Sequence, residues 1–120
     1  MAERRCLARS VVTGDAYLGL SHAARTLYVH LLVTADDDGF TDGVLSAQRL
    51  TETGANELEE LKNAGFVIIF SSGVAAVRHF WVHNTKRSDR YKPTLHTCEK
   101  TQVNKSDNGI YEFAEPCAMQ

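Results

Sequence analysis

The sequence predicts an α+β domain of the winged helix-turn-helix class, with three helices and a β-hairpin as the wing. Three observations predict it: a long amphipathic helical pattern over residues 21–35, two shorter helical patterns separated by Thr53-Gly54, and two strand-like runs separated by Ser71–Gly73. The order helix, short strand, helix, turn, helix, hairpin is that of a winged helix. The second helix of such a helix-turn-helix pair commonly enters the major groove of DNA.

The first helix is indicated by six apolar residues that share one helix face. Ser21 stands before them as an N-cap, because its hydroxyl can accept a free backbone N–H of the first turn. The run Asp36–Gly39 is expected to end the helix, since carboxylates oppose the dipole at a helix C-terminus and glycine permits positive φ. Phe40-Thr41 then offers a very short strand. The six apolar residues are Ala24, Leu27, Tyr28, Leu31, Leu32 and Ala35.

The helix-turn-helix pair follows in two short stretches. Helices are expected over Val44–Thr51 and Ala55–Ala64, and Gly65 is expected to end the second one in the left-handed conformation. Asn56 and Glu59 have the spacing of a capping box.

Two strand-like runs come next, over Phe66–Phe70 and Val74–Val82, and the Ser/Gly residues between them predict a hairpin. After Val82 the chain becomes polar and basic. Residues 97–120 show little periodicity and are expected to form a loosely structured tail, to which Gly109–Phe113 can add one edge strand. The predicted division is therefore 1–96, a winged helix with an N-terminal arm and a basic post-wing segment, and 97–120, the tail.

The composition fits one globular domain whose charges are sorted into blocks. The chain has 120 residues, of which 43% are hydrophobic and 23% charged, and its net charge is −2. Residues 36–60 hold eight acids and one base, a net of −7, whereas residues 78–105 hold seven bases and two acids, a net of +5. Such blocks predict that one face binds a polyanion, or that two copies associate through opposite charges.

Nothing in the sequence indicates catalysis, a metal or another cofactor. Nucleophile-elbow, zinc-protease and phosphate-loop motifs are absent, and Asp36–Asp38 lack the spacing of a calcium loop. His79 and His83 are expected on a strand, where side chains four apart do not converge. No apolar run has the length of a membrane span and no secretory signal is visible, so the expected location is the cytoplasm. Reduced thiols are therefore expected at Cys6, Cys98 and Cys117.

The second helix of the pair is acidic. Glu57, Glu59 and Glu60 stand against Lys62, and carboxylates near phosphates are repulsive, which makes this a poor recognition helix. We expect it instead to be a solvated acidic face or a face that docks on protein.

The basic residues lie in and after the second wing strand. Phe80, Trp81 and Tyr91 interleave with them, a pattern that suits contact with a nucleic-acid backbone and stacking on bases. The alternative is that the aromatic residues pack the strand onto the core and the charges form a solvated connection. The candidate nucleic-acid-binding residues are Arg78, His83, Lys86, Arg87, Arg90 and Lys92.

Several motifs occur together in this chain. They are Arg4-Arg5 leading to Gly14–Leu18, Leu27–Leu31, Ala35–Phe40, Gly73-Val74 leading to Val77–Asn84, and Asp89–Thr94. Together they resemble the N-terminal domain of phage replisome organisers, the DnaD-like replication initiation proteins, over about residues 4–96. The resemblance implies a winged-helix module that supports self-association and protein contacts. In that family a separate C-terminal helical region commonly helps to bind DNA and load helicase, so loading by this chain alone is not expected.

The sequence therefore predicts a phage-type replication initiation module that binds DNA weakly through its basic post-wing segment and self-associates or contacts other replication proteins. Two alternatives stay open: a winged-helix transcriptional regulator that recognises a specific duplex, and an oligomerisation or adaptor module without a nucleic-acid role. An enzyme and a membrane protein are not expected.

Overall fold

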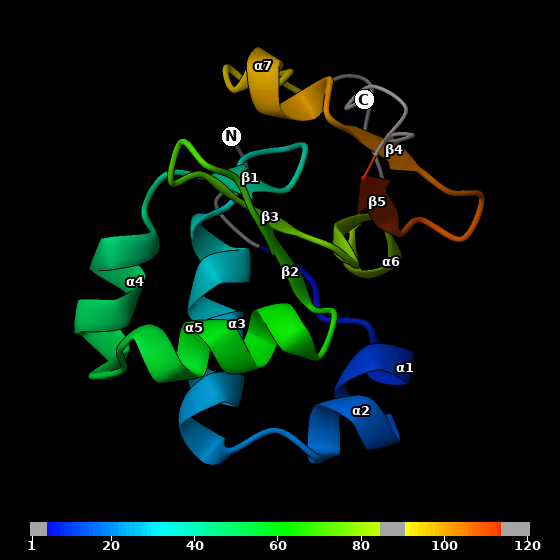
Figure 1. Ribbon diagram of the computed structural model, residues 1–120. Coiled ribbons are helices and arrows are strands. Elements are labelled where there is room, and N and C mark those ends of the chain that lie inside the picture. The colour runs from blue at the N-terminus through cyan, green and yellow to red at the C-terminus, as the bar shows by residue number, and fades with distance from the viewer. Residues whose placement is uncertain (1–4, 85–90, 114–120) are drawn as a thin grey trace.

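The computed structural model describes residues 5–84 and 91–113, which form a mixed α+β fold (Figure 1). The helices are α1 (Arg9–Val12), α2 (Asp15–Leu18), α3 (His22–Thr34), α4 (Val44–Thr51), α5 (Ala55–Asn63), α6 (Phe80–His83) and α7 (Thr97–Lys100). The strands are β1 (Phe40–Thr41), β2 (Val67–Ile69), β3 (Ala75–Val77), β4 (Val103–Lys105) and β5 (Tyr111–Phe113).

Helix α3 lies at the centre of the core. All six apolar residues predicted for its inner face are buried, and the predicted N-cap is present, since Ser21 Oγ accepts the Ala24 N–H at 3.1 Å. Helices α4 and α5 both pack against α3, and α5 crosses in front of it in Figure 1. The prediction for this helix is confirmed, because a 3.6-residue apolar period can be recognised within the segment itself.

Helices α4 and α5 begin at the predicted residues, but the predicted cap of α5 is wrong. Gly54 is the N-cap, and Glu57 Oε1 accepts its N–H at 2.8 Å, so Asn56 and Glu59 do not form the capping pair. At the other end Gly65 has a φ of 85°, the left-handed conformation expected of it.

The three strands of the main sheet are antiparallel in the order β1-β3-β2. The turn Ser71–Gly73 joins β2 to β3, as predicted. Gly39, which precedes β1, has a φ of 90°, and a Cβ at this position would lie 2.7 Å from the Phe80 side chain. Only glycine therefore lets the chain pass this closely over α6 into β1.

The second hairpin strand is shorter than predicted. Strand β3 ends at Val77, and residues 80–83 form the helical turn α6 instead of a continued strand. On a strand, Phe80 and His83 would point to opposite faces, whereas on a helix residues three apart share a face. Both side chains are buried, so the helical turn brings both into the core.

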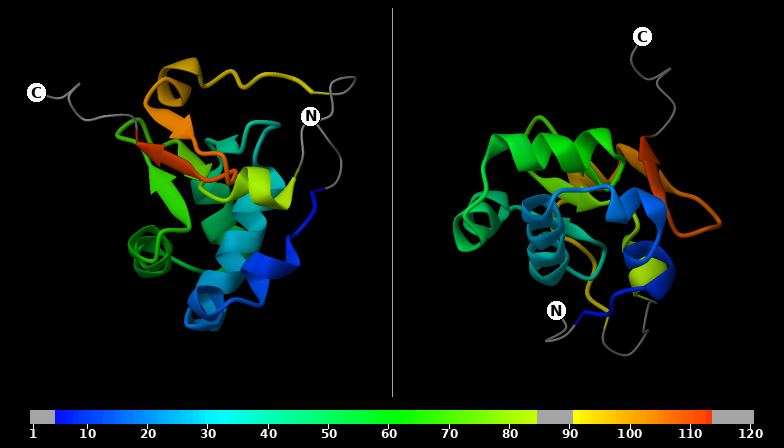
Figure 2. Two further views of the ribbon diagram at one scale, coloured as in Figure 1. Left: turned by 90° about the vertical axis from the view of Figure 1, so that its right-hand side faces the viewer. Right: turned by 90° about the horizontal axis from the view of Figure 1, so that it is seen from below.

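Residues 97–113, expected to belong to a loosely structured tail, are folded onto the rest of the chain. They form α7 and the hairpin β4–β5, which lies beside α6 (Figure 2). Val103 and Tyr111 join the core, and the Tyr111 hydroxyl donates to Asp38 O at 2.7 Å and accepts from Trp81 Nε1 at 2.8 Å. The expected strand at the end of this segment is present as β5, but it pairs with β4. Two separated anchoring residues give no periodic pattern, which explains why the sequence did not predict this layer.

None of the helices in the described part of the chain has the length and apolar character that a bilayer crossing requires.

Candidate nucleic-acid interface

Of the six candidate nucleic-acid-binding residues, Arg78 is bound within the fold. Its side chain is half-buried, Nε donates to Tyr111 O at 2.9 Å, and Nη1 donates to Gly65 O at 3.2 Å. The guanidinium thereby joins the start of β2 to β5. Arg78 therefore holds two backbone carbonyls in place, a role within the fold that the sequence did not predict.

His83 is also an internal residue. It is 6% exposed, and its ring nitrogens lie 2.7 Å from Ala8 N and 2.7 Å from Tyr28 Oη. Since the Ala8 N–H needs an acceptor, Nδ1 is unprotonated and Nε2–H donates to the Tyr28 hydroxyl. Burial, helped by the neighbouring His79, lowers the pKa of His83 to about 4. A neutral, buried ring with both nitrogens in use cannot contact a phosphate, so the expectation for His83 is corrected.

Lys92 is exposed, and only its backbone is fixed, because its N–H donates to Asp37 Oδ2 at 3.0 Å. It is the one candidate residue of the described part whose side chain is presented to solvent. Lys86, Arg87 and Arg90 lie outside the residues that the structure describes.

The loop Asp36–Asp38 binds the segment that follows the basic residues. Asp38 is 2% exposed, and its carboxylate accepts the Tyr91 hydroxyl at 2.7 Å and the Thr94 N–H at 2.8 Å. Asp36 accepts the Thr94 hydroxyl and also the backbone N–H groups of Asp38 and Phe40. Burial and the hydrogen bond to Asp38 raise the pKa of Tyr91, so this phenol remains a donor. The three carboxylates are therefore anchors and not merely a helix stop.

The N-terminal arm meets the same loop. Arg5 Nη2 lies 2.9 Å from Asp37 Oδ1 and donates to Ala35 O at 2.9 Å, with its guanidinium 5.2 Å from the centre of the Phe80 ring. Lys100 approaches Asp38 at 3.4 Å. The acidic and basic blocks of the sequence thus contact one another within a single chain, which weakens the argument that they join two copies.

The basic segment consequently begins and ends at fixed points. Before it, Asn84 Oδ1 accepts the Cys6 N–H at 2.9 Å and Asn84 Nδ2 donates to Cys6 O at 3.3 Å. After it, Tyr91 and Thr94 bond to the Asp36–Asp38 loop. The described residues that flank Thr85–Arg90 in the sequence are thereby held by the rest of the chain.

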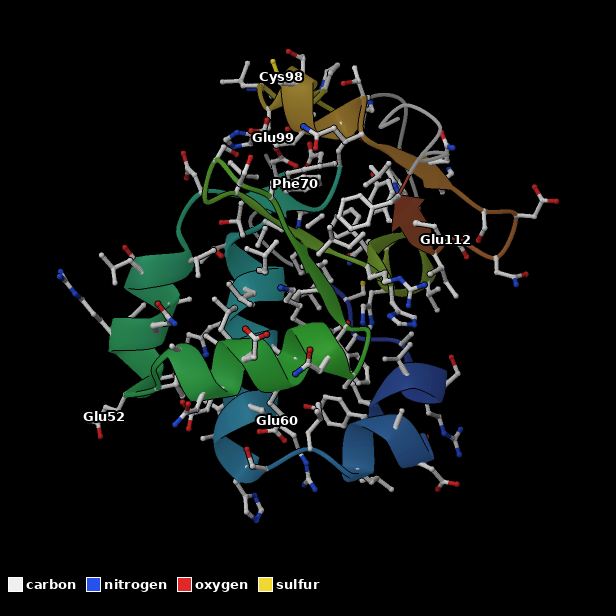
Figure 3. All side chains as sticks on the ribbon, in the orientation of Figure 1. Glu52, Glu60, Phe70, Cys98, Glu99 and Glu112 are labelled. Atoms are coloured by element: carbon white, nitrogen blue, oxygen red, sulfur yellow. The ribbon has the colours of Figure 1, made fainter. Side chains whose placement is uncertain are left out.

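Helix α5 is less acidic on its solvent side than the sequence indicates. Glu57 caps the helix, and Glu60 accepts the Ser21 N–H at 2.8 Å and the Ser21 hydroxyl at 2.9 Å, which places it between α5 and the start of α3 (Figure 3). Glu59 remains exposed, 3.9 Å from Lys62. The exposed polar residues of the helix are Asn56, Glu59, Lys62 and Asn63, a set without net charge.

The tip of the β2–β3 hairpin is bound by α7. Ser72 Oγ donates to Glu99 Oε2 at 2.5 Å, and Figure 3 shows Glu99 below α7, on the side of the hairpin. This hydrogen bond lowers the pKa of Glu99. The hairpin tip is therefore held by the C-terminal layer.

No group of three or more His, Cys, Asp or Glu side chains in the described residues is placed to hold a metal ion. The expected strand geometry of His79 and His83 is wrong, since His79 is the N-cap of α6 and His83 its last residue, but His83 points to Tyr28 and not to a shared site. Cys6 and Cys98 are free and exposed.

Comparison of the chain with protein-family models, with curated proteins and with solved structures finds no match. The resemblance to replisome organisers therefore depends on the sequence motifs alone. Two of those motifs, Ala35–Phe40 and Asp89–Thr94, meet in the structure through the bonds of Asp36 and Asp38 to Thr94. No pattern in the sequence indicated this contact, because the groups of Thr94 that bond to the two carboxylates carry no charge.

Proposed function

We propose that the chain is a winged-helix module that binds nucleic acid through its basic post-wing segment. Helices α3, α4 and α5 are its three helices, and the β2–β3 hairpin is its wing. Of the six residues predicted from the sequence, the contact is made by Lys86, Arg87, Arg90 and Lys92, since Arg78 and His83 serve the fold. The observation that carries this proposal is that Asn84 and Tyr91, which flank the basic residues in the sequence, are each held by side-chain hydrogen bonds.

Attachment favours binding for a physical reason. A free basic chain loses conformational entropy when it is ordered on a polyanion, and a chain held at both ends has lost part of that entropy already. The cations themselves supply affinity by neutralising phosphates and releasing counterions. Such contacts do not read sequence, so weak binding to many sequences is expected.

The setting we propose is phage-type replication initiation, with self-association or contacts to other replication proteins. The motif resemblance supports it, and the meeting of two of its motifs at Asp36–Asp38 is consistent with a shared structural unit.

Fluorescence anisotropy with labelled DNA, double- and single-stranded, tests the nucleic-acid proposal. The variant Lys86→Ala/Arg87→Ala/Arg90→Ala should bind about tenfold to a hundredfold more weakly, since three lost phosphate contacts at about 0.5–1 kcal/mol each sum to about 1.5–3 kcal/mol. Arg9→Ala/Arg49→Ala/Lys62→Ala is a control that removes the same charge from exposed positions elsewhere. Equal affinity of the two triple variants for DNA would contradict a contact specific to the post-wing segment.

A sequence-specific regulator is a second candidate, because hydrogen bonds to Glu57 and Glu60 lessen, without neutralising these carboxylates, the objection to α5 as a recognition helix. Two of its three carboxylates are engaged, and Asn56 and Asn63 remain exposed. Asparagine amides can bond to adenine edges in the major groove. Selection from random duplexes should yield one strong site if this candidate is right, and Asn56→Ala should then relax that preference.

A further inference from the structure

Asn84, the C-cap residue of α6, is paired with the backbone of the N-terminal arm, which runs past α6 in Figure 2. Its Oδ1 accepts the Cys6 N–H at 2.9 Å and its Nδ2 donates to Cys6 O at 3.3 Å. An amide side chain can accept and donate at once, so it satisfies both backbone groups of a single residue. The contact therefore depends on the backbone of the arm and on the side chain of Asn84.

The preceding residue of the arm reaches the other flank of the basic segment. Arg5 Nη2 lies 2.9 Å from Asp37 Oδ1, and Asp37 Oδ2 accepts the Lys92 N–H at 3.0 Å. One carboxylate thus joins Arg5 to Lys92. The Arg5 side chain is 6% exposed and the Asp37 side chain 10%, and a buried ion pair is costly to separate.

Two adjacent residues of the arm consequently contact both flanks of the basic segment. Asn84 and Lys92 are eight positions apart in the sequence, whereas the path between them through Arg5 and Cys6 crosses one peptide bond and one carboxylate. Neighbouring Cα atoms are about 3.8 Å apart, so this path is short. The bond from Ala8 to His83 lies further along the arm and joins neither flank to the other.

We propose that the N-terminal arm positions the nucleic-acid contact, and that Asn84 is a positioning residue that acts through it. Arg5 and Cys6 hold the residue before the basic segment in place relative to Lys92, which follows it. When these bonds are lost, the flanks regain freedom that must be lost again as the cations bind phosphates.

This inference rests on the proposed nucleic-acid contact and extends it to residues that carry no free charge. Asn84 is neutral, and the Arg5 guanidinium is buried against Asp37 and the Phe80 ring. Neither side chain is therefore expected to neutralise a phosphate itself. A positioning residue should change the affinity for DNA without changing the number of phosphates contacted, whereas a phosphate-binding residue changes both.

Fluorescence anisotropy of the full chain with labelled DNA tests this role. Asn84→Ala should bind DNA about three- to tenfold more weakly, the size of effect expected from one or two lost hydrogen bonds. The dependence of its affinity on salt should match that of the wild type, because no cation is removed. Asn108→Ala removes an exposed amide elsewhere, and Cys6→Ala keeps the backbone groups that Asn84 binds, so both controls should bind as the wild type does.

Hydrogen exchange measures the contact in the absence of DNA. The Cys6 N–H should exchange faster with solvent in Asn84→Ala than in Asn108→Ala, while circular dichroism reports the same fold. An unchanged exchange rate overturns the inference, since the arm would then not depend on Asn84.

A double-mutant cycle separates positioning from a general effect on the fold. When Lys86→Ala/Arg87→Ala/Arg90→Ala is already present, adding Asn84→Ala should change the affinity for DNA by less than about twofold, because little basic contact is left to position. An equal loss in both backgrounds would show a general structural effect and overturn the positioning role.

The remaining outcomes distinguish this inference from the proposed function. Wild-type affinity of Asn84→Ala, together with weak binding by the post-wing triple variant, overturns the positioning role and leaves the post-wing contact standing. Equal affinity of the post-wing and control triple variants overturns the post-wing contact, and the positioning role fails with it.

Discussion

Replacement of His83 by phenylalanine distinguishes an internal role from a nucleic-acid role. The His83 ring is buried and bonds to the Ala8 N–H and the Tyr28 hydroxyl. Phenylalanine retains a planar ring of similar size but offers neither an acceptor nor a donor. The Ala8 N–H and the fully buried Tyr28 hydroxyl are then left without these partners.

The expected cost follows from the two orphaned groups. Leaving a buried donor or acceptor without a partner costs about 1–3 kcal/mol, so His83→Phe should lower the free energy of unfolding by about 2–4 kcal/mol. Adding Tyr28→Phe removes one of the orphaned groups. The double variant should therefore be more stable than His83→Phe alone, because replacing both partners of a buried hydrogen bond leaves neither group unpaired.

Urea denaturation measures these differences, and anisotropy measures DNA affinity at a temperature where every variant is folded. His83→Phe should keep the wild-type affinity for DNA, whereas Lys92→Ala should keep the wild-type stability and lose affinity. The reasoning is refuted if His83→Phe unfolds at the wild-type urea concentration and loses DNA binding, since His83 would then act at the nucleic-acid contact.

Three further predictions concern the same structure. Burial lowers the pKa of His83 in the folded state to about 4, so the unfolded state binds more protons between about pH 6.5 and pH 4. The free energy of unfolding should therefore fall as pH falls through this window, by at most about 3 kcal/mol. Urea denaturation at a series of pH values should show a smaller loss in His83→Phe than in the control His22→Gln. Asp38→Asn should weaken DNA binding although it removes a negative charge, because it loosens the hydrogen bonds to Tyr91 and Thr94. The control Asp42→Asn should leave the affinity for DNA equal or slightly higher. Tighter DNA binding by Asp38→Asn in fluorescence anisotropy would contradict this role of Asp38. Deletion of residues 97–120 should lower the thermal unfolding midpoint by several degrees, because Val103 and Tyr111 leave the core; an unchanged midpoint in calorimetry would mean that this layer adds nothing to stability.

The elements that the sequence predicted correctly are those specified by neighbouring residues. The inner face of α3, the Ser21 cap and the left-handed Gly65 all follow from local spacing and local conformational preference. The hairpin over β2 and β3 belongs to the same group, because its Ser/Gly turn residues lie between two apolar, strand-like runs.

The features that the sequence did not predict depend on contacts between distant residues. Phe80 and His83 form a helical turn because both fill the core, which a strand-like composition does not reveal. Residues 97–113 fold because Tyr111 bonds to Asp38 and Trp81, which lie 73 and 30 residues away from it in the sequence. Context of this kind overrides intrinsic preference.

The candidate site shows the same division. The charge blocks were visible in the sequence, but their contact within one chain through Asp36–Asp38 was not. From the sequence, a basic residue after the predicted hairpin was equally compatible with a phosphate contact and with a bond inside the fold. The bonds of Arg78 to the carbonyls of Gly65 and Tyr111 show that it makes the internal bonds.

The dependence of DNA affinity on salt concentration tests the central claim most directly. A plot of log Kd against log salt has a slope set by the number of phosphates that are neutralised, about 0.9 for each on duplex DNA. The claim predicts that Lys86→Ala/Arg87→Ala/Arg90→Ala reduces this slope by about 2 to 3, while the control triple variant leaves it unchanged. An unaltered slope in the post-wing variant would show that these residues do not contact DNA.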